Sequence, residues 1–261
     1  MGRYWRIFRS FFVSGLAREL EFRANFLAKV LHNATWFFFF LMMLLVVYRN
    51  TDQVAGWDRG EAYVLAATSY VMHAITNALF PALQEVPQHV RQGTLDFIIT
   101  KPLDTQFWVS FRRFNFSQVG ALIAGLVMLI AGVVITDIHP GLADLSGYTV
   151  LLVAAVVLFY SMNLALMSLS IYFVRVENLW VLGEMVMETA RYPVEIYGAR
   201  LARILTYYLP IALLATIPAR QLVDGFQASF VGLGLLWAAV VMVLARKFWL
   251  FGLAHYSSAS S

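Results

Sequence analysis

Long hydrophobic stretches that contain no Asp, Glu, Lys or Arg alternate along the chain with short polar segments. The charge-free stretches cover residues 30–48, 62–84, 114–136, 145–174 and 225–245. A helix needs about 20 predominantly apolar residues to cross the hydrocarbon core of a bilayer. The pattern therefore predicts an all-α integral membrane protein, with one membrane-spanning helix in each stretch.

The segment between residues 176 and 224 contains no single clear hydrophobic run. Residues 178–198 have a helical pattern but carry four charged side chains, whereas residues 204–219 are apolar but short and contain Pro210 and Pro218. We favour 178–198 as the fifth span, followed by 204–219 as a broken, re-entrant helix that dips into the outer leaflet under a cover of protein or water. The reverse assignment stays open.

The basic residues predict how the spans are oriented. They gather before the first span, between the second and third, after the fourth and after the last, as Arg3, Arg6, Arg9, Arg18, Arg23, Lys29, Arg91, Lys101, Arg112, Arg113, Arg175, Arg246 and Lys247. Cytoplasmic loops carry an excess of Lys and Arg. The distribution predicts six spans with both termini in the cytoplasm, in a single domain that covers residues 1–261.

Residues 1–25 carry aromatic and basic side chains at helical spacing. The aromatic ones are Tyr4, Trp5, Phe8, Phe11 and Phe12, and they alternate with Arg3, Arg6 and Arg9. Because arginine and aromatic side chains suit the headgroup layer, we expect an interfacial helix on the cytoplasmic leaflet. The alternative is a basic tail that only helps to set the topology.

The polar loop between the second and third spans, residues 85–113, has the turn signals of one or two short helices. Pro87 should kink or end the second span, and Gly93 is suited to ending a short helix. Thr94 and Asp96 fit the N-cap and first turn of a second helix. That helix would carry a small apolar knob made of Leu95, Phe97, Ile98 and Ile99. Such a knob suits a groove on a soluble partner, but an ordinary inner loop explains the residues equally well.

Three stretches of the chain resemble one known family. The polar loop reads RQGTLDFIITKPLDTQF, a later segment reads RYPVEIYGARLARILTYYLPIALLATIPARQLV, and the chain ends in HYSSASS. All three resemble the ABC type-2 exporter permeases, and in particular the small bacterial ABC-2 family transporter proteins. The likeness extends over nearly the whole chain.

The resemblance implies the transmembrane half of an ATP-driven exporter in a bacterial inner membrane. Two permease subunits, identical or paralogous, would pair in the lipid, and each would dock on a separate ATPase subunit. The coupling helix of such permeases maps onto residues 91–102, with the ATPase-coupling residues Arg91, Gly93, Thr94, Leu95, Asp96, Phe97, Lys101 and Pro102. The chain has no G-x-x-x-x-G-K-[ST] loop. We therefore expect ATP and Mg²⁺ on the partner, and neither catalysis nor a cofactor in this chain.

Polar side chains inside the predicted spans mark faces that turn away from lipid, because a charge at the bilayer centre costs about 2.5–3.5 kcal/mol. In the fifth span they are spaced to lie on one stripe of a helix, as Glu184, Glu188, Arg191 and Glu195. His73 and Asn77 form a smaller pair in the second span. Together these side chains are the candidate translocation path; the alternatives are an internal ion pair and interhelical hydrogen bonds. Gly120, Ala121, Ala124 and Gly125 predict close helix packing in the third span.

The remaining composition excludes several functions. The net charge is +4, but the basic residues flank apolar runs and form no patch for nucleic acid. There is no cysteine, and the five histidines are not at metal-ligand spacing. Two other classes stay open: a secondary transporter or channel without an ATPase, and a membrane enzyme. The aromatic-rich spans favour a lipophilic or amphipathic substrate.

Overall fold

The computed structural model describes residues 2–173 and 179–256. Every regular element in these ranges is a helix, and one isolated antiparallel bridge joins Val54 to Trp57. The all-α prediction is confirmed for this part of the chain. Three predicted features lie outside the described residues. They are the ends of two predicted spans at Val174 and Asn178, the basic residue Arg175, and residues 257–261 of the C-terminal tail that resembles the exporter permeases.

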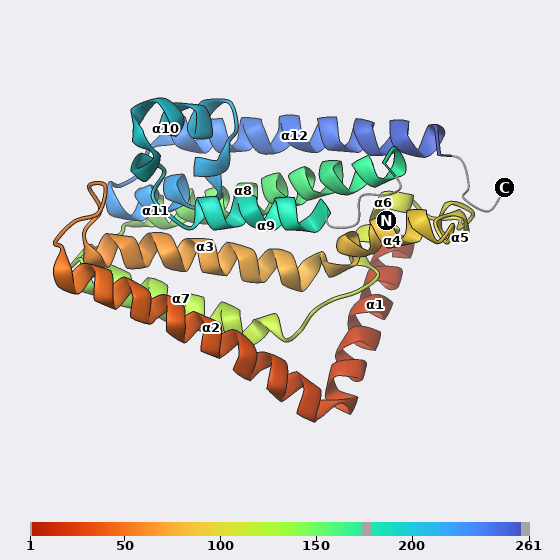
Figure 1. Ribbon diagram of the computed structural model, residues 1–261, viewed down its shortest axis with the longest axis horizontal. Helices are drawn as coiled ribbons and strands as arrows, with labels where there is room; N and C mark the ends of the chain where they lie inside the picture. Colours follow the sequence, from red (N-terminus) through yellow and green to blue (C-terminus); the bar gives the residue numbers. More distant parts are fainter. Residues whose placement is uncertain (1, 174–178, 257–261) are drawn as a thin grey trace.

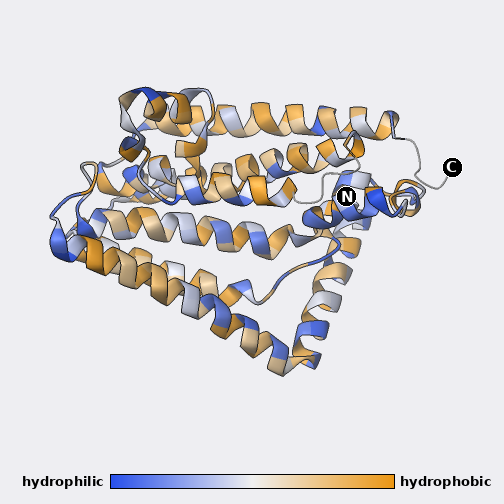
Figure 2. Cartoon of the chain, viewed as in Figure 1, coloured by the Kyte–Doolittle hydropathy of each residue, from blue (hydrophilic) through white to orange (hydrophobic). Residues whose placement is uncertain are grey.

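Four helices in the described ranges are long and apolar enough to cross a membrane. The apolar segments are Ala24–Asn50, Gln118–Ile135, Leu142–Ile171 and Ala228–Ala254. They belong to α2 (Arg23–Asn50), α7 (Gln118–Ile135), α8 (Leu142–Ser168) with η2 (Leu169–Ile171), and α12 (Ala228–Ala254). Figure 1 shows α3 (Arg59–Leu79) and α9 (Leu179–Ala190) lying alongside them. The bodies of the long helices are largely hydrophobic, and hydrophilic segments gather at the two ends of the bundle (Figure 2).

The two ends of the bundle hold different short elements (Figure 1). One end, which we call the α6 end, holds both ends of the described chain together with α1 (Gly2–Glu21), α4 (Val86–Arg91), α5 (Asp96–Ile99) and α6 (Thr105–Phe111). The opposite end, which we call the α10 end, holds α10 (Gly198–Tyr207) and α11 (Thr216–Val223). In chain order, α2, α3, α7, α8, α9 and α12 run in alternating directions between these ends, so the connections alternate between them (Figure 1).

α3 has well-defined start and stop signals. Asp58 and Glu61 form a capping box, in which each side chain accepts a hydrogen bond from the other residue's backbone N–H at 2.8 Å. The helix ends at Leu79, and Pro81 opens the 3₁₀ helix η1 (Pro81–Glu85). The second span predicted over 62–84 is therefore too long. Pro87 does not end it, because Pro87 lies in the first turn of α4, where its missing N–H is tolerated.

α3 and α7 lie so close together that only glycine fits at two of their contact points, Gly125 and Gly132. A Cβ atom on Gly132 would lie 2.8 Å from the backbone nitrogen of Val64, and one on Gly125 would lie 2.8 Å from Cγ2 of Val71. The predicted packing of small residues in this helix is confirmed for Ala121 and Gly125, which are buried. Glycine at these positions brings the two backbones together.

The segment after α8 is broken into short pieces. α9 ends at Ala190, and the helix predicted over 178–198 is wrong beyond that point because Pro193 disfavours helix at Tyr192. A 12-residue helix is about 18 Å long, shorter than the roughly 30 Å hydrocarbon core. The chain continues through η3 (Val194–Tyr197), α10, η4 (Ile211–Leu214) and α11. Ala212, Leu213 and Leu214 are buried in the largest hydrophobic cluster, so protein covers the break around Pro210.

A polar cluster closes the α10 end. Glu195 accepts hydrogen bonds from Trp57 Nε1 at 3.2 Å and from Arg220 Nη2 at 2.9 Å. Arg220 Nη1 also pairs with Asp224 Oδ2 at 2.6 Å. Two carboxylates therefore neutralise the guanidinium, which explains how Arg220 is accommodated among apolar helices. Glu195 lies in η3, so its predicted place on the same helical stripe as Glu184 is wrong.

Candidate functional site

The polar loop folds into a compact unit, which we call the elbow: α4, α5 and α6, residues 86–111. The prediction that Gly93 ends a short helix is confirmed: it follows α4 with a φ of 67°, and its N–H donates to Val90 O at 3.2 Å. Asp96 lies in the first turn of α5, also as predicted. The N-cap prediction for Thr94 is wrong, because its hydroxyl lies 2.7 Å from Nδ1 of His89 and makes no cap contact with α5.

His89 fixes the geometry of the turn between α4 and α5. Its Nε2 lies 2.7 Å from Nη2 of Arg112, which also pairs with Glu85. Arginine can only donate, so Nε2 must be the acceptor and Nδ1 carries the hydrogen that points to Thr94. Burial and the nearby charge of Arg112 lower the pKa of His89, and the opposing effect of Glu85 is smaller. The neutral imidazole is therefore the form that this turn holds.

The predicted apolar knob divides into an inner and an outer half. Leu95 is 0% exposed and Ile98 is 4% exposed, and both belong to a core cluster with residues of α4, α6, α8 and α12. Phe97 is 71% exposed and Ile99 is 38% exposed. The expectation that Leu95 contacts a partner is therefore wrong for this structure. It holds the elbow to the bundle, and Phe97 is the large apolar side chain that α5 presents outward.

The remaining predicted coupling residues flank α5: Arg91 is the last residue of α4, and Lys101 and Pro102 follow α5. Arg91 and Pro102 are exposed. The ammonium of Lys101 lies 3.6 Å from the centroid of the Trp108 ring, and the carbonyl of Pro102 accepts a hydrogen bond from Arg3 Nη2 at 2.9 Å. These contacts tie the end of α5 both to α6 and to α1.

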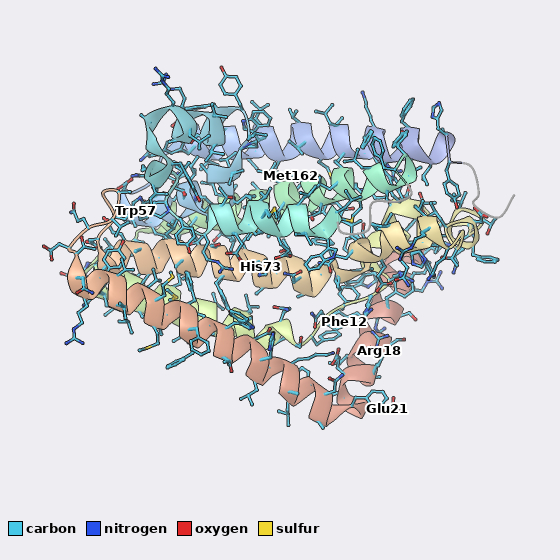
Figure 3. The ribbon with its side chains drawn as sticks, in the orientation of Figure 1. Phe12, Arg18, Glu21, Trp57, His73 and Met162 are labelled. Atoms are coloured by element: carbon cyan, nitrogen blue, oxygen red, sulfur yellow. The ribbon has the colours of Figure 1, made fainter. Side chains whose placement is uncertain are left out.

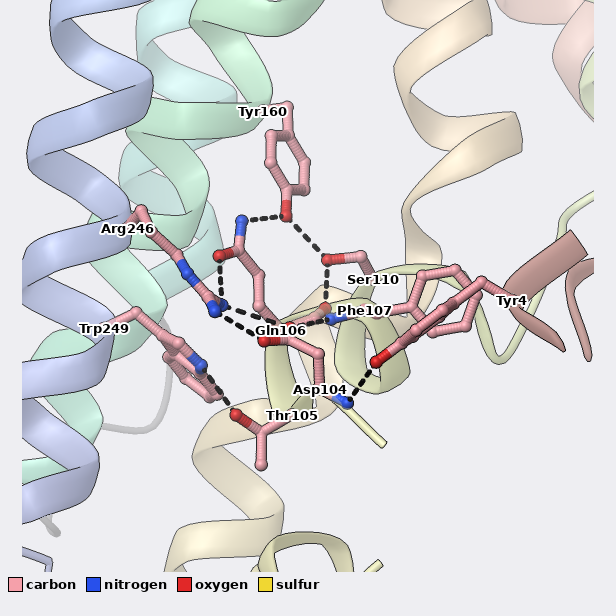
Figure 4. A network of polar contacts seen from close by, with 9 residues as sticks. All are labelled: Tyr4, Asp104, Thr105, Gln106, Phe107, Ser110, Tyr160, Arg246 and Trp249. Atoms are coloured by element: carbon pink, nitrogen blue, oxygen red, sulfur yellow. Dashed lines mark hydrogen bonds and ion pairs between the residues drawn. The ribbon is translucent and has the colours of Figure 1, made fainter. Parts of the chain in front are cut away.

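A hydrogen-bonded network, which we call the clamp, joins the elbow to α8 and α12 (Figure 4). Arg246 of α12 forms a two-pronged ion pair with Asp104, with Nη–Oδ distances of 2.5 and 3.1 Å, and donates to Gln106 Oε1 at 2.8 Å. Gln106 Nε2 donates to the hydroxyl of Tyr160 at 2.9 Å, and the same hydroxyl lies 2.7 Å from Ser110 Oγ. Bidentate arginine–carboxylate pairs fix orientation as well as distance.

The clamp is continuous with the start of α6. Asp104 caps this helix by accepting the backbone N–H of Phe107 at 3.0 Å, and its own N–H donates to the Tyr4 hydroxyl of α1 at 3.3 Å. Trp249, which is fully buried, donates from Nε1 to Thr105 Oγ1 at 3.2 Å. Burial acts to raise the pKa of Asp104, but the hydrogen bonds from Arg246 and from the N–H of Phe107 outweigh it and lower the pKa below its ordinary value.

α1 supports the other side of the elbow. Its aromatic side chains pack edge-on against α6 and the residues that follow it: Tyr4 on Phe107 at 5.0 Å between ring centroids, Phe11 on Trp108 at 5.2 Å, and Phe12 on Phe116 at 5.0 Å. The helix predicted within residues 1–25 is confirmed, and it crosses the direction of the long helices at a steep angle (Figure 1). Much of its aromatic face is thus occupied by the chain itself, whereas Trp5 remains 65% exposed.

Three of the charged residues predicted inside the membrane, Glu184, Glu188 and Arg191, line a cavity of about 860 Å³ between α2, α3, α7 and α9. His73 lies midway along α3 (Figure 3) and its Nε2 is 3.0 Å from Glu184 Oε2 on α9. Arg191, just beyond α9, pairs with Glu188 at 2.9 Å. Asn77 Nδ2 lies 2.8 Å from His73 Nε2, beside the cavity. Of the predicted path residues, the structure brings these five together and leaves Glu195 at the α10 end.

The clamp was not anticipated from the sequence, and only a weak signal pointed to it. The sequence places Arg246 only in the basic flank of the last span, and Asp104 lies 142 positions away from it. The Asp-Thr-Gln start of α6 is a helix-cap pattern, which marks the cap but not its partner.

A helical bundle with several apolar helices of membrane length is the architecture of a multi-pass membrane protein. The family model for the ABC-2 family transporter protein matches residues 34–260, which is most of the chain. This chain therefore belongs to the ABC-2 transporter family, the membrane permeases of ABC transporters, and the resemblance seen in the sequence is confirmed. A comparison with curated proteins gave no match.

Proposed function

We propose that this chain is the permease subunit of an ABC exporter, which moves an amphipathic substrate out of the cytoplasm or the inner leaflet. A separate ATPase subunit would bind ATP and Mg²⁺ and dock on the elbow, and a second permease subunit would complete the transporter. The exposed Phe97 on a firmly held α5 is the observation that carries the proposal.

The elbow combines an exposed contact surface with a rigid base. Interface hot spots are large side chains whose neighbours keep them in place. Phe97 and Ile99 face outward, while Ile98 on the same short helix and Leu95 at its N-terminal boundary are buried against the bundle. A force applied to Phe97 would therefore pass through the core cluster to α8 and through the Asp104–Arg246 pair to α12.

Replacing Phe97 by alanine should weaken binding of the ATPase by about 30-fold or more, because truncating a hot-spot residue commonly costs on the order of 2 kcal/mol. Adding Asp96→Lys, which inverts a charge beside it, should weaken binding further. The measurement is the affinity of the purified ATPase for the permease, together with transport rate. Leu142→Ala, at a side chain that is 88% exposed at the α10 end, is the matched control and should change neither. Normal binding and transport by the double variant would reduce the elbow to an ordinary inner loop.

We further propose that the chain crosses the membrane six times, through α2, α3, α7, α8, α9 and α12, with the α6 end in the cytoplasm. The alternating connections in Figure 1 and the basic residues at the α6 end support this orientation. α9 would cross the membrane together with η3, which follows it directly. The later segment around Pro210 and Pro218 would be the re-entrant part, and the hydrophobic cluster described above covers it.

Single cysteines test this topology cleanly, because the chain contains no cysteine of its own. Cysteines at Gln53 and His139 should react with a membrane-impermeant maleimide on intact cells. Cysteines at Gln92 and His255 should react only after the membrane is opened. Reaction of the His255 position on intact cells would be incompatible with a cytoplasmic C-terminus.

A further inference from the structure

The cavity between α2, α3, α7 and α9 has walls of two kinds. Large apolar side chains from α2 and α9 form one kind, including Trp36, Phe39 and Trp180. The other is a polar strip made by His73 and the charged residues Glu184, Glu188 and Arg191. A volume of about 860 Å³ lies within the range of sites that hold drug-sized ligands.

Close packing on the neighbouring face of α9 directs this strip into the cavity. A Cβ atom on Gly183 would collide with the side chain of Asn163 on α8, so α9 rests on α8 through its glycine. Trp180, Glu184 and Glu188 are four residues apart and lie on one face of the helix, and all three line the cavity. The polar strip therefore faces the cavity because of how α9 is packed.

The charges in the cavity are not balanced. Arg191 is matched by Glu188, at 2.9 Å, and its guanidinium also lies 5.1 Å from the centroid of the Phe40 ring. Glu184 contacts His73 at 3.0 Å, and no Lys or Arg of residues 2–173 and 179–256 lies within salt-bridge distance of it. Two carboxylates and one guanidinium leave one negative charge in excess while His32 and His73 are neutral.

We infer that this cavity binds an amphipathic organic cation, with the Glu184 carboxylate as its counter-ion and the aromatic side chains of α2 and α9 around its apolar body. A carboxylate in an apolar surrounding gains most from a ligand of opposite charge. Tryptophan faces add to the affinity for a cation, and Trp36 and Trp180 supply them here. The inference rests on the proposed transport function, since it names the substrate class of that transporter.

A pair of ions with the same shape and opposite charge tests the inference: tetraphenylphosphonium and tetraphenylborate. Binding is measured to the purified full-length chain in detergent, without ATPase, as quenching of tryptophan fluorescence corrected with empty micelles. We expect the phosphonium to bind at least tenfold more tightly than the borate. Glu184→Gln should weaken phosphonium binding about tenfold or more and remove most of the preference. Glu21→Gln, an exposed carboxylate at the end of α1, is the matched control and should change neither.

A second variant keeps the test informative if Glu184→Gln folds poorly. Arg191→Met adds to the negative excess, so it should tighten phosphonium binding severalfold and weaken borate binding. Equal affinity for the two ions, or unchanged binding in Glu184→Gln, would overturn the cation site. Neither readout involves the ATPase, so a failure of docking in the Phe97→Ala experiment would count against the exporter proposal and leave this site standing, and the reverse also holds.

Discussion

Replacing Leu95 by alanine is expected to lower the free energy of unfolding by about 2–5 kcal/mol, the range for a fully buried leucine. The side chain is 0% exposed and packs with Val90, Ile98 and Val109 in the cluster that joins the elbow to the bundle. Its removal would leave a cavity between a four-residue helix and its base, and so short a helix cannot hold its own conformation. Thermal unfolding of the purified chain in detergent measures the loss.

Phe97→Ala is the internal control for this prediction, since it removes a larger apolar side chain only two residues away, within α5. Phe97 is 71% exposed, so we expect a change of stability within about 0.5 kcal/mol. The two variants should therefore separate stability from docking: Leu95→Ala unfolds at lower temperature, and Phe97→Ala loses the ATPase. If Leu95→Ala unfolds like the unmodified chain, then the inward orientation of α5 is wrong.

Replacing Arg246 by methionine is expected to disconnect the elbow from α12. Methionine keeps most of the apolar stem but removes the donors to Asp104 and Gln106. Hydrogen bonds to charged groups are worth about 1.5–3 kcal/mol. Solvent weakens the interaction because both side chains are about one-third exposed, so the expected loss of stability lies at the lower end of this range. We expect lower thermal stability and, in the assembled transporter, ATP hydrolysis that no longer drives transport at the normal ratio.

Two further variants separate the clamp from a general loss of charge. Lys247→Met removes the neighbouring, exposed basic residue and should have little effect on either quantity. Adding Asp104→Asn to Arg246→Met removes the carboxylate left without its partner, so the double variant should recover part of the stability. An Arg246→Met variant with normal coupling and normal stability would show that the ion pair does not connect the two elements.

The membrane helices could be predicted because absence of charge is a local property of the sequence. The charge-free runs located α2, α7, α8 and α12, and proline and glycine located the short elements of the elbow. The same local signals also misled where a neighbour decided the outcome. Thr94 has the composition of an N-cap, but its hydroxyl goes to His89, and the spacing of Glu195 fits a stripe that Pro193 interrupts.

The candidate sites were only partly predictable, for a related reason. The spacing in the sequence predicts that His73 and Asn77 share one face of α3, and that Glu184 and Glu188 share one face of α9, because helical periodicity fixes which residues share a face. It did not show that the two pairs meet across one cavity, which depends on α9 resting on α8 through Gly183. Nor did any pattern reveal that Leu95 points inward while Phe97 points outward, since the orientation of a four-residue helix is set by the core beneath it.

The close contact between α3 and α7 limits how these two helices can move relative to each other. Both ends of the elbow lead into these two helices, which meet through Gly125 and Gly132. Sliding one helix along the other would drive a neighbouring side chain into space that only a glycine leaves open, and packed interiors resist such overlap. If the ATPase docks on the elbow as proposed, its movement would therefore turn α3 and α7 together as one rigid body, rather than slide one helix along the other.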